Sequence, residues 1–219
     1  MKVRSFLVIG AGRLGTALSS TLFDLGHEVV VVDRSEAALE PVMAHATQAI
    51  ALDAVDEETL ARLGPANFDA VVVAIGESFE GAVLAVAAAK ALGAQRIVAK
   101  ATTELAAQVL EKVGADEVVR PEHDSGVRLA RHLVTPALVD AFELGENYGV
   151  EEIEAGPDLV GTLAHLRLTN RFHVQVIAVA RDEKLTAAPK ADFVVTEGDR
   201  LVVIGATADL DRFREALGG

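Results

Sequence analysis

The first 33 residues contain the pattern that most restricts how this chain can fold. Two apolar runs, 6–9 and 29–32, lie on either side of a glycine-rich turn at 10–15, and Asp33 follows the second run. A strand, a glycine-rich turn, a helix and a second strand ending in an acid form the βαβ unit that binds nucleotides. The alternative is a glycine-rich turn without a ligand.

Each glycine of this turn has a distinct expected role. Gly10 allows the tight turn after the strand, Gly12 lets the backbone approach a diphosphate, and Gly15 lets the helix pack closely. A helix beginning near Arg13 directs its free N–H groups and the positive end of its dipole at the phosphates. Asp33, 18 residues after Gly15, is placed to accept the ribose hydroxyls.

The apolar and amphipathic segments continue to alternate as far as residue 120. Expected strands are 3–9, 28–32, 47–52, 70–75, 96–101 and 117–120. Expected helices are 13–25, 36–45, 57–63, 79–92 and 103–113. This alternation predicts an α/β fold, a Rossmann-like doubly wound parallel sheet of order 3-2-1-4-5-6.

The pattern changes after Pro121. We expect a helix to about residue 133, a second helical stretch after Pro136 reaching 143, and a linker at 145–149. Expected elements beyond it are a strand at 150–154, a helix at 159–168, a strand at 174–180, a hairpin of 192–196 with 200–204, and a helix at 207–217. The predicted domains are therefore 1–135, a crossover helix and linker at 136–148, and a small α+β domain at 149–219.

Composition excludes several functions. The formal net charge of −13 repels phosphodiester backbones, and only 4% of residues are aromatic, so nucleic acid is not an expected partner. The longest apolar run, 82–89, is too short to cross a bilayer. With no cysteine, disulfides and thiol chemistry are excluded. The expected location is the cytoplasm, without membrane insertion.

Candidates for catalysis are few. The histidines are scattered along the chain, at positions 27, 45, 123, 132, 165 and 173. His123 and Asp124 are neighbours on an expected helix, so their side chains diverge. No sequence spacing typical of a metal site or of a nucleophile is present. A nucleotide site without such groups indicates a sensor rather than an enzyme.

Further motifs resemble the RCK-domain family, which regulates potassium conductance in bacterial Ktr and Trk uptake systems. These are the turn at 10–15, Asp33, Asp53, the segments 74–76 and 100–102, and above all 114–126, Gly-Ala-Asp-Glu-Val-Val-Arg-Pro-Glu-His-Asp-Ser-Gly. The resemblance covers nearly the whole chain. It implies a cytoplasmic homo-oligomer, an octameric ring of dimers, bound beneath a membrane potassium-translocating subunit of the inner membrane. ATP and ADP, or NADH and NAD, would compete for its nucleotide site.

The resemblance also implies roles for individual residues. The implied nucleotide-binding residues are Gly10, Gly12, Arg13, Leu14, Gly15, Asp33, Arg34, Asp53, Ala54, Ala74, Ile75, Gly76 and Lys100. Adenine would lie near Asp53, Ala54 and Ala74. Arg13 would reach a terminal phosphate and distinguish ATP from ADP, unless it is a solvated surface arginine. Lys100 could approach the phosphates as a point charge.

Glu122 is the implied ligand of a divalent or monovalent cation, because a carboxylate beside phosphates needs a neutralising ion. The alternative is an acid in the first turn of a helix that begins at Pro121.

Other interpretations stay open. Relatives that bind cyclic di-AMP carry an Arg and an Asn where this chain offers Thr169 and Gln175. Binding of cyclic di-AMP is therefore not predicted, and strand 174–180 could instead lie at a dimer interface. The alternative functions are an NAD(H)-dependent oxidoreductase and an RCK subunit of another cation transporter.

Overall fold

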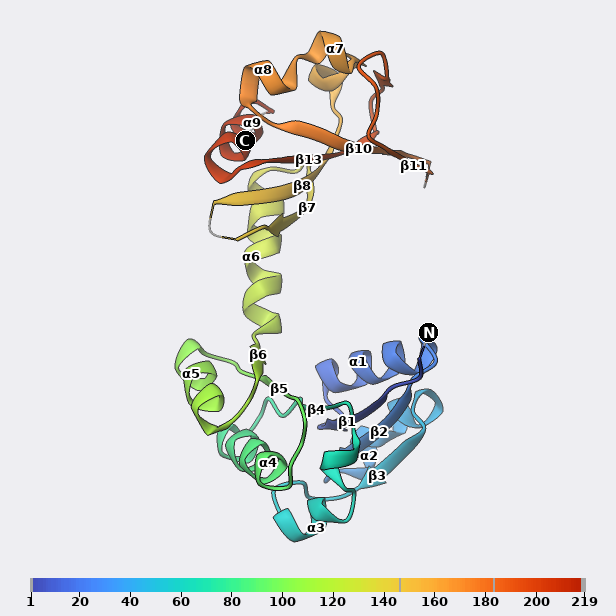
Figure 1. Cartoon of the computed structure of the whole chain (residues 1–219), viewed down its shortest axis with the longest axis vertical. Helices are drawn as coiled ribbons and strands as arrows, with labels where there is room; N and C mark the ends of the chain where they lie inside the picture. Colours follow the sequence, from blue (N-terminus) through green and yellow to red (C-terminus); the bar gives the residue numbers. More distant parts are fainter. Residues whose placement is uncertain (1, 146, 183, 218–219) are drawn as a thin grey trace. The chain divides into compact units, whose positions relative to one another are not determined.

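The computed structural model describes residues 2–145, 147–182 and 184–217. The chain divides into two compact units, Met1–His123 and Asp124–Gly219, and the division falls inside helix α6 (Pro121–Val134). Figure 1 shows a mainly parallel α/β unit in blue and green, and a second unit in yellow to red.

The N-terminal unit is built on a six-stranded parallel sheet. Its order is β3-β2-β1-β4-β5-β6, as predicted. The strands are β1 Ser5–Ile9, β2 Glu28–Asp33, β3 Gln48–Ala51, β4 Ala70–Val73, β5 Ile97–Lys100 and β6 Glu117–Val119. In β4 every residue is buried, as expected for a strand covered on both faces.

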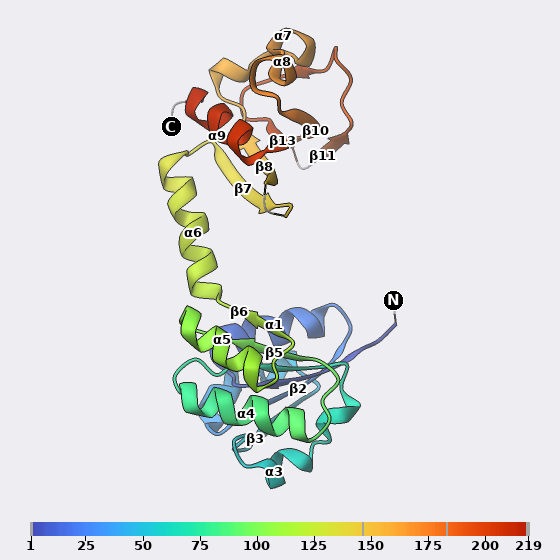
Figure 2. The same ribbon diagram turned by 60° about the vertical axis from the view of Figure 1, so that its left-hand side comes forward.

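Helices cover both faces of this sheet. On one face α1 (Arg13–Asp24) packs with the short α2 (Glu36–Leu39) and the 3₁₀ helix η1 (Glu40–His45) against Val8, Val31 and Val72. On the other face α4 (Phe79–Ala91) and α5 (Glu104–Val113) lie side by side against Leu7, Val71 and Ile97 (Figure 2). Shorter elements, α3 (Glu57–Ala61) and η2 (Pro65–Asn67), complete the connections.

One predicted helix of this unit differs from the structure. The helix expected at 36–45 is α-helical only to Leu39 and continues as 3₁₀ helix to His45. Pro41 lies near the start of the 3₁₀ segment. Its missing N–H and its ring are incompatible with an unbroken α-helical ladder.

The helical stretch expected after Pro136 is wrong. Residues Leu138–Glu143 form strand β7, which pairs antiparallel with β8 (Tyr148–Glu154). Glu154 N–H also donates to the Ala137 carbonyl, so this segment takes its hydrogen bonds from a neighbouring strand. Of the expected linker 145–149, residue 146 lies outside the described residues, and 148–149 belong to β8.

The C-terminal unit contains a five-stranded antiparallel sheet of order β11-β10-β13-β8-β7. Its remaining strands are β10 Gln175–Arg181, β11 Lys184–Ala187 and β13 Arg200–Ala206, with a separate pair of β9 Gly161–Thr162 and β12 Val194–Val195. Its helices are η3 Pro157–Leu159, α7 Leu163–Leu166, α8 Leu168–Phe172 and α9 Thr207–Ala216. Phe213 of α9 and Leu201 of β13 are fully buried in its core.

Two more predictions fail in this unit. The expected hairpin does not form, because β12 pairs with β9 while β13 pairs with β10 and β8. The helix expected at 159–168 is divided into short pieces, and Arg167 adopts the left-handed conformation, φ 51°, between α7 and α8. Strand β11 was not predicted. Within the described part of the chain no helix is long and apolar enough to cross a membrane.

Candidate functional site

A cavity of about 570 Å³ lies where β1, β2, β3 and β4 end. In a doubly wound sheet this carboxyl edge is where ligands bind, beside the strand order reversal. Nine of the predicted residues line it: Gly10, Gly12, Asp33, Arg34, Asp53, Ala54, Ala74, Ile75 and Gly76. Arg13, Leu14, Gly15, Lys100 and Glu122 lie elsewhere in the same unit.

The glycines of the turn differ in what surrounds them. Gly10 has φ +104°, and a Cβ there would lie 3.2 Å from the Ala74 carbonyl carbon. A Cβ on Gly15 would lie 1.8 Å from the Gly10 carbonyl oxygen, so Gly15 keeps the turn and helix α1 in contact. Gly12 differs from both, since nothing lies within 4 Å of its Cβ position.

Gly12 therefore borders open space in the cavity, and a side chain there would fill part of it. It is also the N-cap of α1 and, being glycine, provides no side chain to cap the helix. The first N–H groups of an α-helix have no partner within the helix, and the dipole is positive at this end. Gly12 and the first turn of α1 together form a nucleotide cradle, whose unpaired N–H groups and open space fit a diphosphate.

Asp33 joins the end of β2 to this turn. Its Oδ2 accepts a hydrogen bond from Ala11 N–H at 2.8 Å, and its Oδ1 accepts one from Ser35 N–H at 2.9 Å. A carboxylate has about four acceptor positions, so these two bonds leave Asp33 able to accept ribose hydroxyls. The residue thus holds the turn in place and can also bind ligand.

Beyond Asp33 the cavity wall is formed by the residues after β3 and β4. Asp53 Oδ1 accepts from Val55 N–H at 3.1 Å, which fixes the carboxylate at the cavity. Ala54 and Ala74 are both 5% exposed. Their small apolar side chains provide a surface against which a flat ring can pack.

The start of α4 also lines the cavity, although it is not among the site residues expected from the sequence. The additional residues from this segment are Glu77, Ser78, Glu80, Gly81 and Leu84. Ser78 is the N-cap of α4, and its Oγ accepts from Gly81 N–H at 3.0 Å. A serine cap two residues after Gly76 was the available signal, since the helix that follows a strand begins at the same sheet edge.

Lys100 and Glu122 form an ion pair beside the cavity. Lys100 Nζ donates to Glu122 Oε1 at 2.7 Å, with the Lys100 side chain 11% exposed and that of Glu122 54% exposed. The hydrogen bond from Lys100 is the main cause of a lowered pKa at Glu122, and the charge of Arg13 lowers that pKa further. The three residues thus form one electrostatic cluster.

The cation expected at Glu122 stays a prediction, because phosphate oxygens of a bound nucleotide would supply its other ligands. The Glu122 carboxylate already has an ammonium ion as its partner. Among residues 2–145, 147–182 and 184–217, no three or more His, Asp or Glu side chains are grouped so that they could hold a metal ion.

The C-terminal unit contains a smaller cavity, of about 210 Å³, lined mainly by apolar side chains. Thr169 and Gln175, where cyclic di-AMP-binding relatives would carry Arg and Asn, both line it. The Thr169 hydroxyl donates to the Val174 carbonyl at 3.1 Å and lies 3.4 Å from Gln175 Oε1. The two polar side chains therefore contact each other.

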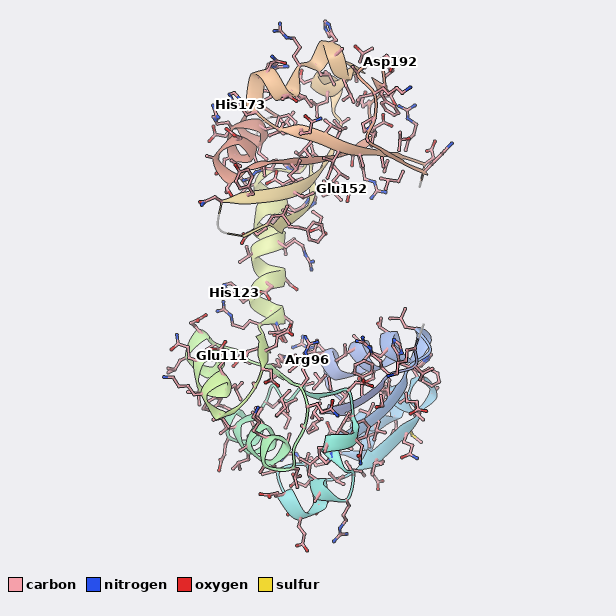
Figure 3. The ribbon with its side chains drawn as sticks, in the orientation of Figure 1. Arg96, Glu111, His123, Glu152, His173 and Asp192 are labelled. Atoms are coloured by element: carbon pink, nitrogen blue, oxygen red, sulfur yellow. The ribbon has the colours of Figure 1, made fainter. Side chains whose placement is uncertain are left out.

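The histidines do not gather at either cavity. His123 lies in the first turn of α6 and His173 follows α8, so the two belong to different units (Figure 3). His132 Nδ1 lies 2.9 Å from the Leu138 carbonyl oxygen, within the C-terminal unit.

Comparisons with known proteins agree with this two-unit organisation. Residues 6–121 match the TrkA-N domain and residues 151–218 match the TrkA-C domain. The chain is 35% identical to Ktr system potassium uptake protein C of Bacillus subtilis over 213 residues, which cover 97% of this chain and 96% of that protein. It is 34% identical to Ktr system potassium uptake protein A of Vibrio alginolyticus, with 92% of each chain covered.

Solved structures share the fold. The crystal structure of the GsuK RCK domain matches all of this chain with a TM-score of 0.71 at 19% identity, and the match covers 48% of that chain. The GsuK channel bound to NAD also has a TM-score of 0.71, at 20% identity, with 100% of this chain and 40% of that chain covered. This chain thus spans about half the length of those proteins or less.

Proposed function

Because this chain belongs to the family of Ktr potassium uptake proteins with TrkA-N and TrkA-C domains, we propose that it is the nucleotide-sensing regulatory subunit of a potassium uptake system. The supporting observation is a complete nucleotide cradle in a chain that matches Ktr proteins A and C over at least 92% of its length.

In this proposal the nucleotide lies across the carboxyl edge of the sheet. The diphosphate lies against Gly12 and the start of α1, and the ribose hydroxyls donate to Asp33. The adenine packs near Ala54 and Ala74, beside Asp53. Arg13 would contact the terminal phosphate of ATP in its own or a neighbouring subunit, because a guanidinium can bind two phosphate oxygens at once.

The proposed mechanism is a conformational switch. ATP and ADP would favour different shapes of a homo-oligomeric ring, an octamer, attached from the cytoplasm to a membrane potassium-translocating subunit. A difference of about 1–3 kcal/mol per site in the affinities of the two shapes is enough for such coupling. The cation expected at Glu122 stays a prediction, and cyclic di-AMP binding by the C-terminal unit stays an open alternative.

Thermal unfolding in the presence of ATP, ADP, NAD or NADH tests this function. A ligand that binds only the folded protein raises the midpoint, and at a fixed concentration the rise grows with the logarithm of its affinity. We expect ATP and ADP to raise the midpoint, ATP more strongly. Tight NADH binding with turnover of a small hydroxy acid would instead favour the alternative, an NAD(H)-dependent oxidoreductase, which the βαβ unit and Asp33 also allow.

A second experiment concerns the partner. Purification of the tagged chain with the membrane proteins of its own host should recover a potassium-translocating subunit. Recovery of another transporter, such as a cation/proton antiporter, would keep the nucleotide sensor and change the transporter that it regulates.

A further inference from the structure

The Lys100 side chain reaches its position by crossing Gly76. A Cβ placed on Gly76 would lie 3.0 Å from Lys100 Nζ, 3.5 Å from Cε and 3.7 Å from Cδ. Gly76 is not among the glycines with positive φ. A side chain there would crowd the end of the Lys100 side chain, and no unusual backbone conformation requires the glycine.

This passage places an ammonium ion at the edge of the nucleotide cavity. Gly76 lines the cavity, and the Lys100 side chain is only 11% exposed. The ammonium is therefore largely withdrawn from solvent, with Glu122 as its anionic partner at 2.7 Å. An ion pair with one partly buried member is weakly screened by salt and responds strongly to any new charge nearby.

Glu122 belongs to an element that connects the two units. It lies in the first turn of α6, which starts in the N-terminal unit and continues into the C-terminal unit. The Lys100–Glu122 hydrogen bond thus joins the end of β5 to the beginning of this connecting helix.

We propose that Lys100 is a switch between two anions: it binds Glu122 in the nucleotide-free protein and leaves it for the terminal phosphates of a bound nucleotide. This inference rests on the proposed nucleotide site. The phosphates lie on the cavity side of Gly76 and carry more negative charge than one carboxylate, so they attract the ammonium. Release of Glu122 then frees the first turn of α6 from β5. The ligand class is a nucleoside polyphosphate. The attraction of its phosphates for the Lys100 ammonium increases from AMP to ADP to ATP.

A double-mutant cycle on Lys100 and Glu122 tests the switch. The affinities of ATP, ADP and AMP would be measured by calorimetry, in EDTA, for the wild type, Glu122→Gln, Lys100→Met and the double variant. Methionine keeps the apolar stem that packs on Gly76. Removing the competing carboxylate should tighten ATP binding about three- to tenfold, the range for a charge-assisted hydrogen bond that is partly exposed. ADP should gain less, and AMP should change less than about twofold.

The double variant identifies the cause. In the Lys100→Met background, Glu122→Gln should change ATP affinity less than about twofold. The effects of two substitutions are coupled only through the interaction between the two side chains, and Lys100→Met has already removed that interaction. A matched control is Glu117→Gln, because Glu117 also forms a carboxylate–cation pair in the N-terminal unit, with Arg96 at 2.6 Å. Arg96 precedes the start of β5 and Glu117 begins β6, so this pair lies at the amino ends of the strands, opposite the cavity. This control should leave ATP affinity unchanged.

The outcomes separate the two proposals. If the wild type binds none of the nucleotides, the proposed function is wrong and the switch with it. If ATP binds but Glu122→Gln leaves its affinity unchanged or weakens it, the switch alone is wrong. An equal gain in both Lys100 backgrounds would also overturn it, because Glu122 would then repel the phosphates without involving Lys100.

Discussion

The two units use their charged side chains in different ways. In the N-terminal unit the parallel strands all end at one edge, and the polar residues that follow them, among them Asp33 and Asp53, meet around one cavity of about 570 Å³. In the C-terminal unit the antiparallel strands end at both edges. Asp199, the most buried acid among the described residues of this unit, instead holds a loop: it accepts from Arg181 Nε at 2.7 Å and from Thr196 N–H at 2.8 Å.

This difference shows how topology decides the role of a residue type. Parallel connection gathers side chains that are far apart in sequence, so they can surround one ligand. Antiparallel connection pairs neighbouring segments, so a buried carboxylate mostly satisfies nearby backbone and guanidinium groups. We therefore expect the N-terminal unit to bind ligands. We expect the stability of the C-terminal unit to depend on its internal ion pairs.

The largest expected effect is that of Gly15→Ala on the N-terminal unit. Its Cβ would lie 1.8 Å from the Gly10 carbonyl oxygen, and backbone cannot move away as a flexible side chain can. We expect a loss of about 3 kcal/mol or more in the free energy of unfolding. Hydrogen exchange read by mass spectrometry would show the loss in 2–123 and not in the C-terminal sheet.

Gly12→Ala is the matched control for this change. Since nothing lies within 4 Å of its Cβ position, stability should change by less than about 1 kcal/mol, while nucleotide binding should weaken strongly. A Gly15→Ala protein as stable as Gly12→Ala would contradict the packing role of Gly15.

The next effect concerns the C-terminal unit. Asp199→Ala removes a carboxylate that is 2% exposed, together with its hydrogen bonds to Arg181 and Thr196. We expect a loss of about 2–3 kcal/mol, the range for hydrogen bonds that involve charged groups. Denaturant unfolding, with the single tyrosine Tyr148 as a probe of this unit, measures it.

A matched control is Glu152→Gln, which breaks the more exposed pair with Arg200. This change should cost less than about 1 kcal/mol. Equal losses for the two variants would mean that burial of Asp199 contributes nothing.

Arg13→Ala tests whether the N-terminal unit distinguishes ATP from ADP by a contact with the terminal phosphate. ATP affinity should fall about tenfold, equivalent to about 1.4 kcal/mol, whereas ADP affinity should change less than about twofold. Calorimetry with both nucleotides measures the difference. Equal falls for ATP and ADP would show that Arg13 does not distinguish them.

The smallest expected effect is a pH dependence of the stability of the C-terminal unit. The hydrogen bond from Arg181 is the main cause of a lowered pKa at Asp199, and Thr196 N–H contributes. Because this pKa is lower in the folded protein, the carboxylate contributes stability that is fully present above about pH 4. That stability is lost as the pH falls through the folded-state pKa.

The comparison variant is Asp199→Asn. The difference in unfolding midpoint between wild type and this variant should shrink on acidification below about pH 4. A difference that stays constant with pH would mean that the Asp199 charge is not responsible.

The sequence predicted the N-terminal unit better than the C-terminal one. Buried parallel strands such as Val71-Val-Val are apolar throughout, and Gly10, Gly12 and Gly15 have fixed spacing, so the sheet order and most of the cavity wall could be predicted. Residues 138–143 were predicted as helix because their apolar and polar residues form too short a run to distinguish a helix from a strand. Only pairing with β8 makes them a strand, and such pairing depends on residues distant in sequence.

The sequence by itself determined the βαβ unit, the sheet order and the family, because these follow from local spacing of glycines, apolar runs and caps. The tertiary structure alone decided that Lys100 crosses Gly76 to bind Glu122, and that Asp199 is buried against Arg181. The first of these ion pairs joins residues 22 positions apart and the second residues 18 positions apart, so no local periodicity records them. Topology brings such residues together, and their charges then determine what each pair can do.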